Sequence, residues 1–267
     1  MTRRRKAGKK QARKNQTGRV YIKTGIAGLD NLFTKGIPRG SNILIAGGAG
    51  SGKTILCLQI ITNAAKNGKR CIYMSFEEHE ERLREHMEDF GWNAREMEKK
   101  GNLIIKRFSS FDISKSMDAM MAKQRGELMI DVEPLILPKG FRPDIIVVDS
   151  LSAISSYFIG REQNYRSYIE QLFRFFEESG ATSFLITETE EPEKMFSRSG
   201  VEEFLADGVI VLYNMRRGDV RENAIEVLKM RGAEHKKRVV AMQILSGKGI
   251  EVYPEQEVFG AMGDKPA

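Results

Sequence analysis

The stretch ILIAGGAGSGKT, residues 43–54, decides the fold of this chain. It starts with four apolar residues, passes through a turn rich in glycine and ends in a Gly-Lys-Thr triplet. The pattern GxxxxGK(S/T) between a buried strand and a helix is the signature of a phosphate-binding loop, because glycines let successive backbone N–H groups curl around phosphate oxygens. We therefore expect a strand at Ile43–Ala46, a phosphate site in the turn, and a helix over Thr54–Asn67.

The residues of this loop have separate roles in holding a nucleoside triphosphate. Lys53 reaches the β- and γ-phosphates, and the Thr54 hydroxyl is a ligand for Mg²⁺. The N-terminus of the following helix adds a positive dipole. The predicted contacts with the nucleotide come from Gly48, Ala49, Gly50, Ser51, Gly52, Lys53, Thr54 and Ile55.

Two further apolar runs end in polar residues. The run PDIIVVDS, residues 143–150, carries Asp149 at the carboxyl end of its strand, which is the Walker B pattern for holding Mg²⁺, here through water. A hydrophobic strand that ends in aspartate is common, so this assignment depends on the phosphate loop. Together they predict a Mg²⁺ site from Thr54 and Asp149. The strand end Thr187-Glu188 is expected to sense the γ-phosphate.

Hydrolysis also requires a residue that orients the attacking water. Many nucleotidases place a glutamate directly after the Walker B aspartate, but that position is Ser150 here. A buried strand ends in Glu77 and Glu78, and carboxyl ends of strands form the ligand edge of an open α/β sheet. We expect at least one of the pair to be catalytic. The alternative is that both merely favour the positive start of the next helix, and the sequence does not distinguish between the two glutamates.

From Val20 to about Pro254, short β-branched runs alternate with helical patterns, which predicts an α/β fold with a mostly parallel sheet flanked by helices. The last strands have no helix between them, so we expect antiparallel strands at the C-terminal end. The expected strands are Ile43–Ala46, Cys71–Phe76, Leu103–Arg107, Ile145–Asp149, Ser183–Thr187, Val209–Tyr213, Ala224–Met230 and Val239–Leu245. The expected helices are Thr54–Asn67, Glu80–Phe90 and Glu162–Ser179, with a helix and a long loop within Phe111–Pro143.

The basic charge of the chain is concentrated at its start. Residues 1–19 hold nine Lys or Arg and no acidic residue, so the remainder has 43 − 9 = 34 basic and 36 acidic residues. With no aromatic residue, this tail is expected to be disordered. It would bind nucleic acid or another polyanion through phosphate contacts, or be a solvated extension. We divide the chain into the tail at 1–19, one folded domain at 20–255 and a flexible C-terminal tail at 256–267.

Composition excludes some function classes. No apolar run approaches the roughly 20 residues that span a bilayer, so no membrane association is expected. Cys57 and Cys71 have neither CxxC spacing nor zinc-ligand neighbours, which predicts reduced, buried thiols in a cytoplasmic protein.

The stretch KMRGAEH, residues 229–235, ends an alternating apolar run. In a strand, Lys229 and Arg231 point to the same side, followed by Gly232 and then His235. The residues alone leave two interpretations open: a pair of solvated cations, or a site for an anion.

Several motifs stand in order: TGIAGLDNLFTKGIPRGS at 24–41, the phosphate loop, FEEHEE, VVDSLSAI, LITETEE, SGVEEFLADGVIVLYN and KMRGAEH. Together they resemble the KaiC-like ATPases of the RecA superfamily, single-domain and archaeal in type, over residues 20–255. The resemblance implies a RecA-like core assembled into rings, typically hexamers, with ATP between subunits. It also implies that Lys229 and Arg231 reach the neighbour's γ-phosphate, and that His235 lies near the same nucleotide.

The chain departs from the clock-type members of that family. It has one such domain where the cyanobacterial clock protein has two, and the phosphorylated Ser-Thr pair aligns with Glu203-Phe204, so no autokinase activity is expected there. RadA-type recombinases share the core but use a phenylalanine tether that residues 1–19 lack.

Three functions follow as hypotheses. The favoured one is a slow Mg²⁺-dependent ATPase with a regulatory or signalling role. The alternatives are a nucleotide-stabilised oligomeric platform for an unknown protein partner, with little hydrolysis, and a RadA-related ATPase that binds nucleic acid through its tail. ATP is preferred over GTP by resemblance alone.

Overall fold

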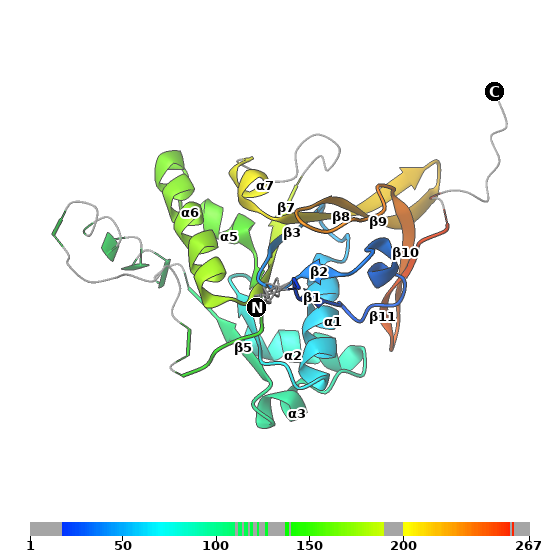
Figure 1. The fold of residues 1–267 in the computed structure, drawn as a ribbon, viewed down its shortest axis with the longest axis horizontal. Helices are drawn as coiled ribbons and strands as arrows, with labels where there is room; N and C mark the ends of the chain where they lie inside the picture. Colours follow the sequence, from blue (N-terminus) through cyan, green and yellow to red (C-terminus); the bar gives the residue numbers. More distant parts are fainter. Residues whose placement is uncertain are drawn as a thin grey trace, which may run out of the picture.

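The computed structural model describes residues 18–109, 141–189 and 200–256, together with residue 258 and scattered residues between 110 and 140. The predictions made for the two tails therefore lie almost entirely outside the described residues, and the prediction for Phe111–Pro143 lies partly outside them. Within them, a nine-stranded sheet in the order β11-β10-β9-β8-β3-β7-β6-β4-β5 runs through the molecule (Figure 1).

Six parallel strands form the larger part of this sheet, and an antiparallel end follows them. The parallel strands are β3 (Asn42–Gly47), β4 (Cys71–Ser75), β5 (Leu103–Arg107), β6 (Ile145–Asp149), β7 (Thr182–Glu188) and β8 (Gly208–Arg217). The antiparallel strands are β9 (Val220–Met230), β10 (Val240–Leu245) and β11 (Gly249–Tyr253). The predicted fold class is confirmed. The last strand, β11, was not predicted, and a short pair, β1 (Tyr21–Ile22) with β2 (Ile37–Pro38), was also missed.

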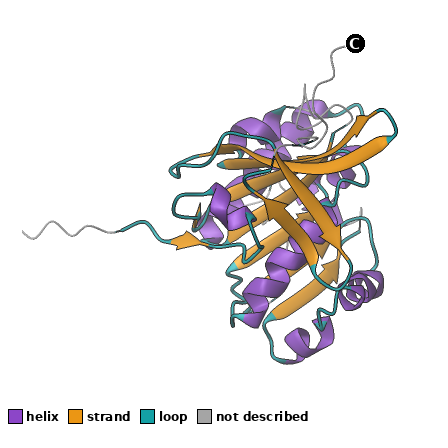
Figure 2. Cartoon of the chain, turned by 90° about the vertical axis from the view of Figure 1, so that its right-hand side faces the viewer, coloured by secondary structure: helices purple, strands orange, loops and turns teal. Residues whose placement is uncertain are grey.

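Helices cover both faces of the sheet (Figure 2). One face carries η1 (Leu29–Leu32), α1 (Lys53–Lys66), α2 (Glu80–Asp89) and α3 (Ala94–Lys99). The other carries α5 (Leu151–Ser156), α6 (Glu162–Ser179) and α7 (Val201–Leu205). Among the described residues, no helix combines the length and the apolar character that crossing a membrane requires.

Helix α6 shows how the sequence specifies these layers. Its apolar residues recur three and four positions apart, which places them on one side of a helix. That side is buried against the sheet, and the helix stops at Gly180, whose φ of 68° is the left-handed conformation that glycine adopts at little cost. The buried residues of this stripe are Tyr165, Tyr168, Ile169, Leu172, Phe173 and Phe176. Cys57 and Cys71 are free and buried, as predicted.

The register of the parallel strands aligns their carboxyl ends. Gly47 at the end of β3 pairs with Glu188 of β7, and Ser75 at the end of β4 pairs with Asp149 of β6. Since β6 and β7 are also paired with each other, the four strand ends lie along one edge of the sheet.

The approach of η1 to the C-terminal strand β11 provides a test of the fold. Gly28 has φ 79°, and a Cβ there would lie 1.8 Å from the carbonyl oxygen of Val252. Gly68 has a similar φ of 75° but nothing within 4 Å of a Cβ. Both Gly28→Ala and Gly68→Ala add left-handed strain of about 1 kcal/mol, but only Gly28→Ala also separates the two segments. We expect thermal unfolding to show a much lower Tm for Gly28→Ala, and equal losses would contradict this packing.

Candidate functional site

The phosphate loop lies between β3 and α1, as predicted. Gly50 and Gly52 have φ values of 71° and 98°, which only glycine adopts readily, and they turn the chain tightly into the helix. A Cβ on Gly52 would lie 2.9 Å from Cδ1 of Ile244, so strand β10 covers this part of the loop. The hydroxyl of Ser51 is buried and has no hydrogen-bond partner among the described residues. Phosphate oxygens would accept from such a donor, so the loop fits its predicted ligand.

Lys53 is the central cation of the site. Its side chain is only 8% exposed, and its Nζ donates to the carbonyl of Gly48 at 2.9 Å. The carboxylate of Glu188 lies 3.9 Å from Nζ. Burial lowers the pKa of Lys53, while the negative charges of Glu188 and Asp149 raise it. Anionic phosphate oxygens beside Nζ would offset the desolvation that this ammonium suffers.

Asp149 and Thr54 are brought together as predicted. The Thr54 hydroxyl donates to Oδ2 of Asp149 at 3.0 Å, and the Tyr73 hydroxyl donates to the same oxygen at 2.5 Å. Burial raises the pKa of Asp149 to about 6, although the hydrogen bonds from Tyr73 and Thr54 oppose that shift. A hydroxyl and a buried carboxylate are oxygen ligands of the kind Mg²⁺ prefers, so these residues fit the ion. Tyr73 was missed, and its signal was a phenol in an otherwise apolar buried strand.

The two glutamates after β4 have different surroundings. Glu77 accepts a hydrogen bond from the hydroxyl of Ser150, directly beside Asp149. Its charge is also among those that raise the pKa of Lys53. Glu78 instead lies 3.6 Å from Arg82 and 3.6 Å from His86, both on α2. Glu77 therefore faces the phosphate loop more directly.

These strand ends line a cavity of about 420 Å³. Part of the cavity wall was not predicted from the sequence: His86 of α2, Phe90 directly after α2, and Ile244 of β10. Of the predicted site residues, it contains Gly50, Gly52, Lys53, Thr54, Ile55, Glu77, Glu78 and Asp149, together with Glu188.

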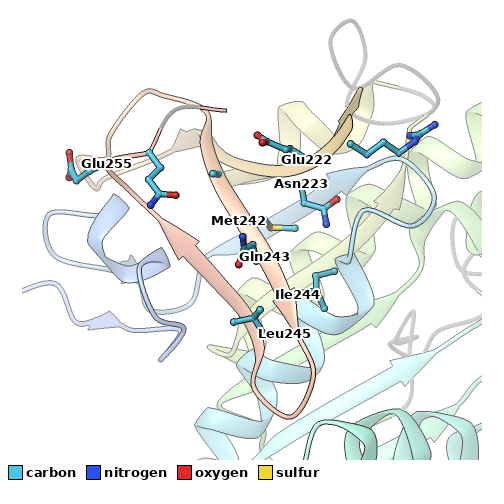
Figure 3. A pocket seen from close by; sticks show the side chains of 10 residues that line it. Glu222, Asn223, Met242, Gln243, Ile244, Leu245 and Glu255 are labelled. Carbon is cyan, nitrogen blue, oxygen red and sulfur yellow. The ribbon is translucent and has the colours of Figure 1, made fainter. Parts of the chain in front are cut away.

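A larger hollow of about 800 Å³ lies on the antiparallel strands (Figure 3). It is lined by side chains such as Glu222, Asn223 and Gln243, and contains neither Lys53 nor Asp149. Ile244 borders both spaces. The smaller cavity, with its cation, carboxylates and hydroxyl, is therefore the candidate site.

Lys229, Arg231 and His235 do not line that cavity. Lys229 pairs with Val209, whereas the start of the phosphate loop pairs with Leu212, so the two lie roughly 10 Å apart along β8. Lys229 and Arg231 lie at the amino-terminal ends of the parallel strands, away from the phosphate loop. His235 is bridged to Phe33, and its Nε2 is buried without a hydrogen-bond partner among the described residues.

Both cations contact the C-terminal end of α7 in their own chain. Lys229 donates to the carbonyls of Glu203 at 2.9 Å and Ala206 at 2.7 Å. Arg231 donates to the carbonyl of Phe204 at 2.9 Å and lies 3.9 Å from Asp207. Burial lowers the pKa of Lys229, and the charge of Arg231 lowers it further. Arg231 nevertheless keeps a side chain that is 55% exposed.

Similar proteins include KaiC3, named a circadian clock protein, of Synechocystis, which is 33% identical over 87% of this chain. The chain spans about half of that longer relative, 45% of its length. UPF0273 proteins of Pyrococcus horikoshii and Thermotoga maritima are 34% and 33% identical, with 94% and 96% of their lengths covered.

A solved structure and a family model also match this chain. The crystal structure of a KaiC-like protein of Pyrococcus horikoshii superposes with a TM-score of 0.73 at 28% identity, over 89% of this chain and all of the other. The family model described as "ATPase: KaiC" matches residues 22–257, which include every site residue discussed above. The chain therefore belongs to the KaiC family of ATPases.

Proposed function

We propose that this chain hydrolyses Mg-ATP slowly, at sites completed by a second copy of itself within a homo-oligomeric ring, typically a hexamer. The observation that carries this proposal is the division of the charged residues. Lys53, Thr54, Glu77 and Asp149 share one cavity, whereas Arg231 lies toward the other ends of the same strands. A site that needs both groups requires two chains.

Each residue in the cavity has a distinct role in the proposal. Lys53 binds the β- and γ-phosphates, and Thr54 and Asp149 would hold the Mg²⁺, which neutralises charge on the phosphates when bound. Glu77 orients a water toward the γ-phosphorus and accepts its proton. The new bond to the water oxygen forms as the bond between the γ-phosphorus and the bridging oxygen of ADP breaks. The hydrogen bond that Glu77 accepts from Ser150, next to Asp149, supports Glu77 rather than Glu78 as this base.

Arg231 and Lys229 are proposed to act on the nucleotide of the neighbouring chain. Cations placed there stabilise the charge that develops in phosphoryl transfer. The half-exposed side chain of Arg231 supports this role, because it is available to a second molecule while its backbone N–H, directly after β9, donates to the carbonyl of Asp207 at 2.7 Å. His235 is proposed to lie near the same boundary.

A regulatory role is supported by relatives that are named circadian clock proteins. Slow turnover is supported by the contacts already made within the chain, since Lys53 donates to Gly48 and Glu77 accepts from Ser150. The expected cytoplasmic location is supported by Cys57 and Cys71, which are both free thiols rather than partners in a disulfide.

The two adjacent glutamates offer a matched pair for testing the base. We expect Glu77→Gln to reduce ATP turnover by roughly a hundredfold or more, since it removes the proton acceptor. Glu78→Gln should retain most turnover, because Glu78 faces α2. Binding of a fluorescent ATP analogue should be preserved in both. The assignment is wrong if Glu78→Gln is the slower enzyme.

A mixing experiment tests whether the site is shared between chains. Arg231→Ala and Lys53→Ala are each expected to lose turnover by roughly a hundredfold or more when alone. Mixed in equal amounts, they should recover a part of wild-type activity, because an Arg231 from one chain can meet an intact Lys53 in the other. Specific activity of the wild type should rise with protein concentration.

Failure to recover activity, with a wild-type rate that is independent of concentration, would show that one chain holds the whole site. ATP that binds without any hydrolysis would favour the nucleotide-stabilised platform instead.

The basic segment at the start of the chain is proposed to bind nucleic acid. Residues 1–19 hold nine of the 43 basic residues of the chain. Deleting residues 1–19 should abolish salt-sensitive binding of single-stranded DNA or RNA. Before deletion, the slope of log affinity against log salt concentration should be no steeper than about −6. Filter binding at several salt concentrations measures it. Unchanged affinity after the deletion would remove nucleic acid as a partner of this segment.

A further inference from the structure

An exposed aromatic side chain lies beside Arg231. Five large hydrophobic side chains are exposed among the described residues, and Phe204 in α7 is one of them, at 78%. Arg231 donates to the carbonyl of Phe204, and Lys229 donates to the carbonyl of the preceding residue, Glu203. We call Phe204, together with Lys229 and Arg231, the finger face.

The backbone that carries Phe204 is firmly held while its ring is exposed. Glu202, two residues earlier in α7, is only 1% exposed and accepts a hydrogen bond from the Tyr165 hydroxyl of α6. After it, the carbonyls of Glu203 and Ala206 accept from Lys229. An aromatic ring on a fixed backbone loses little conformational freedom when it is buried by a partner, and such rings are preferred anchors of interfaces.

We propose that Phe204 is the apolar anchor through which the finger face docks on a second copy of this chain, beside the copy's nucleotide cavity. Charge selects that occupant, since the finger face is cationic and the cavity is lined by five carboxylates, from Glu77, Glu78, Asp89, Asp149 and Glu188. Phe204 is thus a positioning residue that holds Arg231 in place without touching the nucleotide. The inference rests on the proposed function, because it deepens the shared site.

Assembly is the direct measurement of this role. Sedimentation velocity of the full chain with Mg²⁺ and a non-hydrolysable ATP analogue would be recorded over a range of protein concentrations. We expect Phe204→Ala to raise the concentration for half-assembly at least tenfold, and Phe204→Leu to restore most of it. Ile159→Ala is the matched control, since Ile159 is 81% exposed but lies between α5 and α6.

Turnover gives a second readout. At low protein concentration, Phe204→Ala should lose activity, and at concentrations high enough to force assembly it should regain the wild-type rate, which Arg231→Ala cannot do. Binding of the fluorescent analogue should be unchanged. The role proposed for Phe204 would be wrong if Phe204→Ala assembled like the wild type. It would also be wrong if Ile159→Ala weakened assembly as much as Phe204→Ala does.

The two proposals fail separately. If Phe204→Ala prevents assembly but the Arg231→Ala and Lys53→Ala mixture stays inactive, the anchor stands and the shared site is wrong. If the mixture recovers activity while Phe204→Ala assembles normally, the shared site is supported and the role proposed for Phe204 is wrong.

Discussion

The alignment of strand ends along one edge of the parallel sheet is the constraint on which the site depends. Backbone hydrogen bonds fix Gly47 opposite Glu188 and Ser75 opposite Asp149. A shift of one residue in either pair would turn every side chain of that strand to the other face. Because both faces of β3 are buried, such a shift would also disrupt two cores, and packing therefore protects the geometry of the chemistry.

The antiparallel end of the sheet determines where the cations proposed to act on a second molecule lie. Strand β9 runs opposite to β8, so its last residues return to the amino-terminal ends of the parallel strands. The direction of one strand thus separates Arg231 from Lys53 within the chain. Helix α7 then fixes the exposed cation, since its terminal carbonyls carry partial negative charge that attracts Lys229 and Arg231.

The sequence predicted those parts of the fold and of the candidate site in which neighbouring residues of the chain act together. The phosphate loop, the strand ending in Asp149 and the apolar stripe of α6 could all be predicted, because each depends on residues close together in the chain. Phe90 and Ile244 could not, since they reach the cavity from separate elements whose register only the fold sets. The same holds for the hydrogen bond from Tyr73 to Asp149, which joins two strands. The different surroundings of Glu77 and Glu78 likewise depend on Ser150 and on α2, which no spacing reveals.

The buried charges of the cavity also link ligand binding to stability. Asp149 is buried, and its pKa of about 6 means that its ionised form is disfavoured in the folded chain relative to the unfolded one, where the pKa is near 3.8. The stability lost to this group therefore grows as pH rises from about 3.8 to about 6 and stays constant above that range. Burial also disfavours the charged form of Lys53, and because that form is the protonated one, its pKa is lowered. A ligand that brings both a cation and phosphates would offset both penalties at once, so a metal–nucleotide complex is expected to stabilise the folded chain more than either part alone.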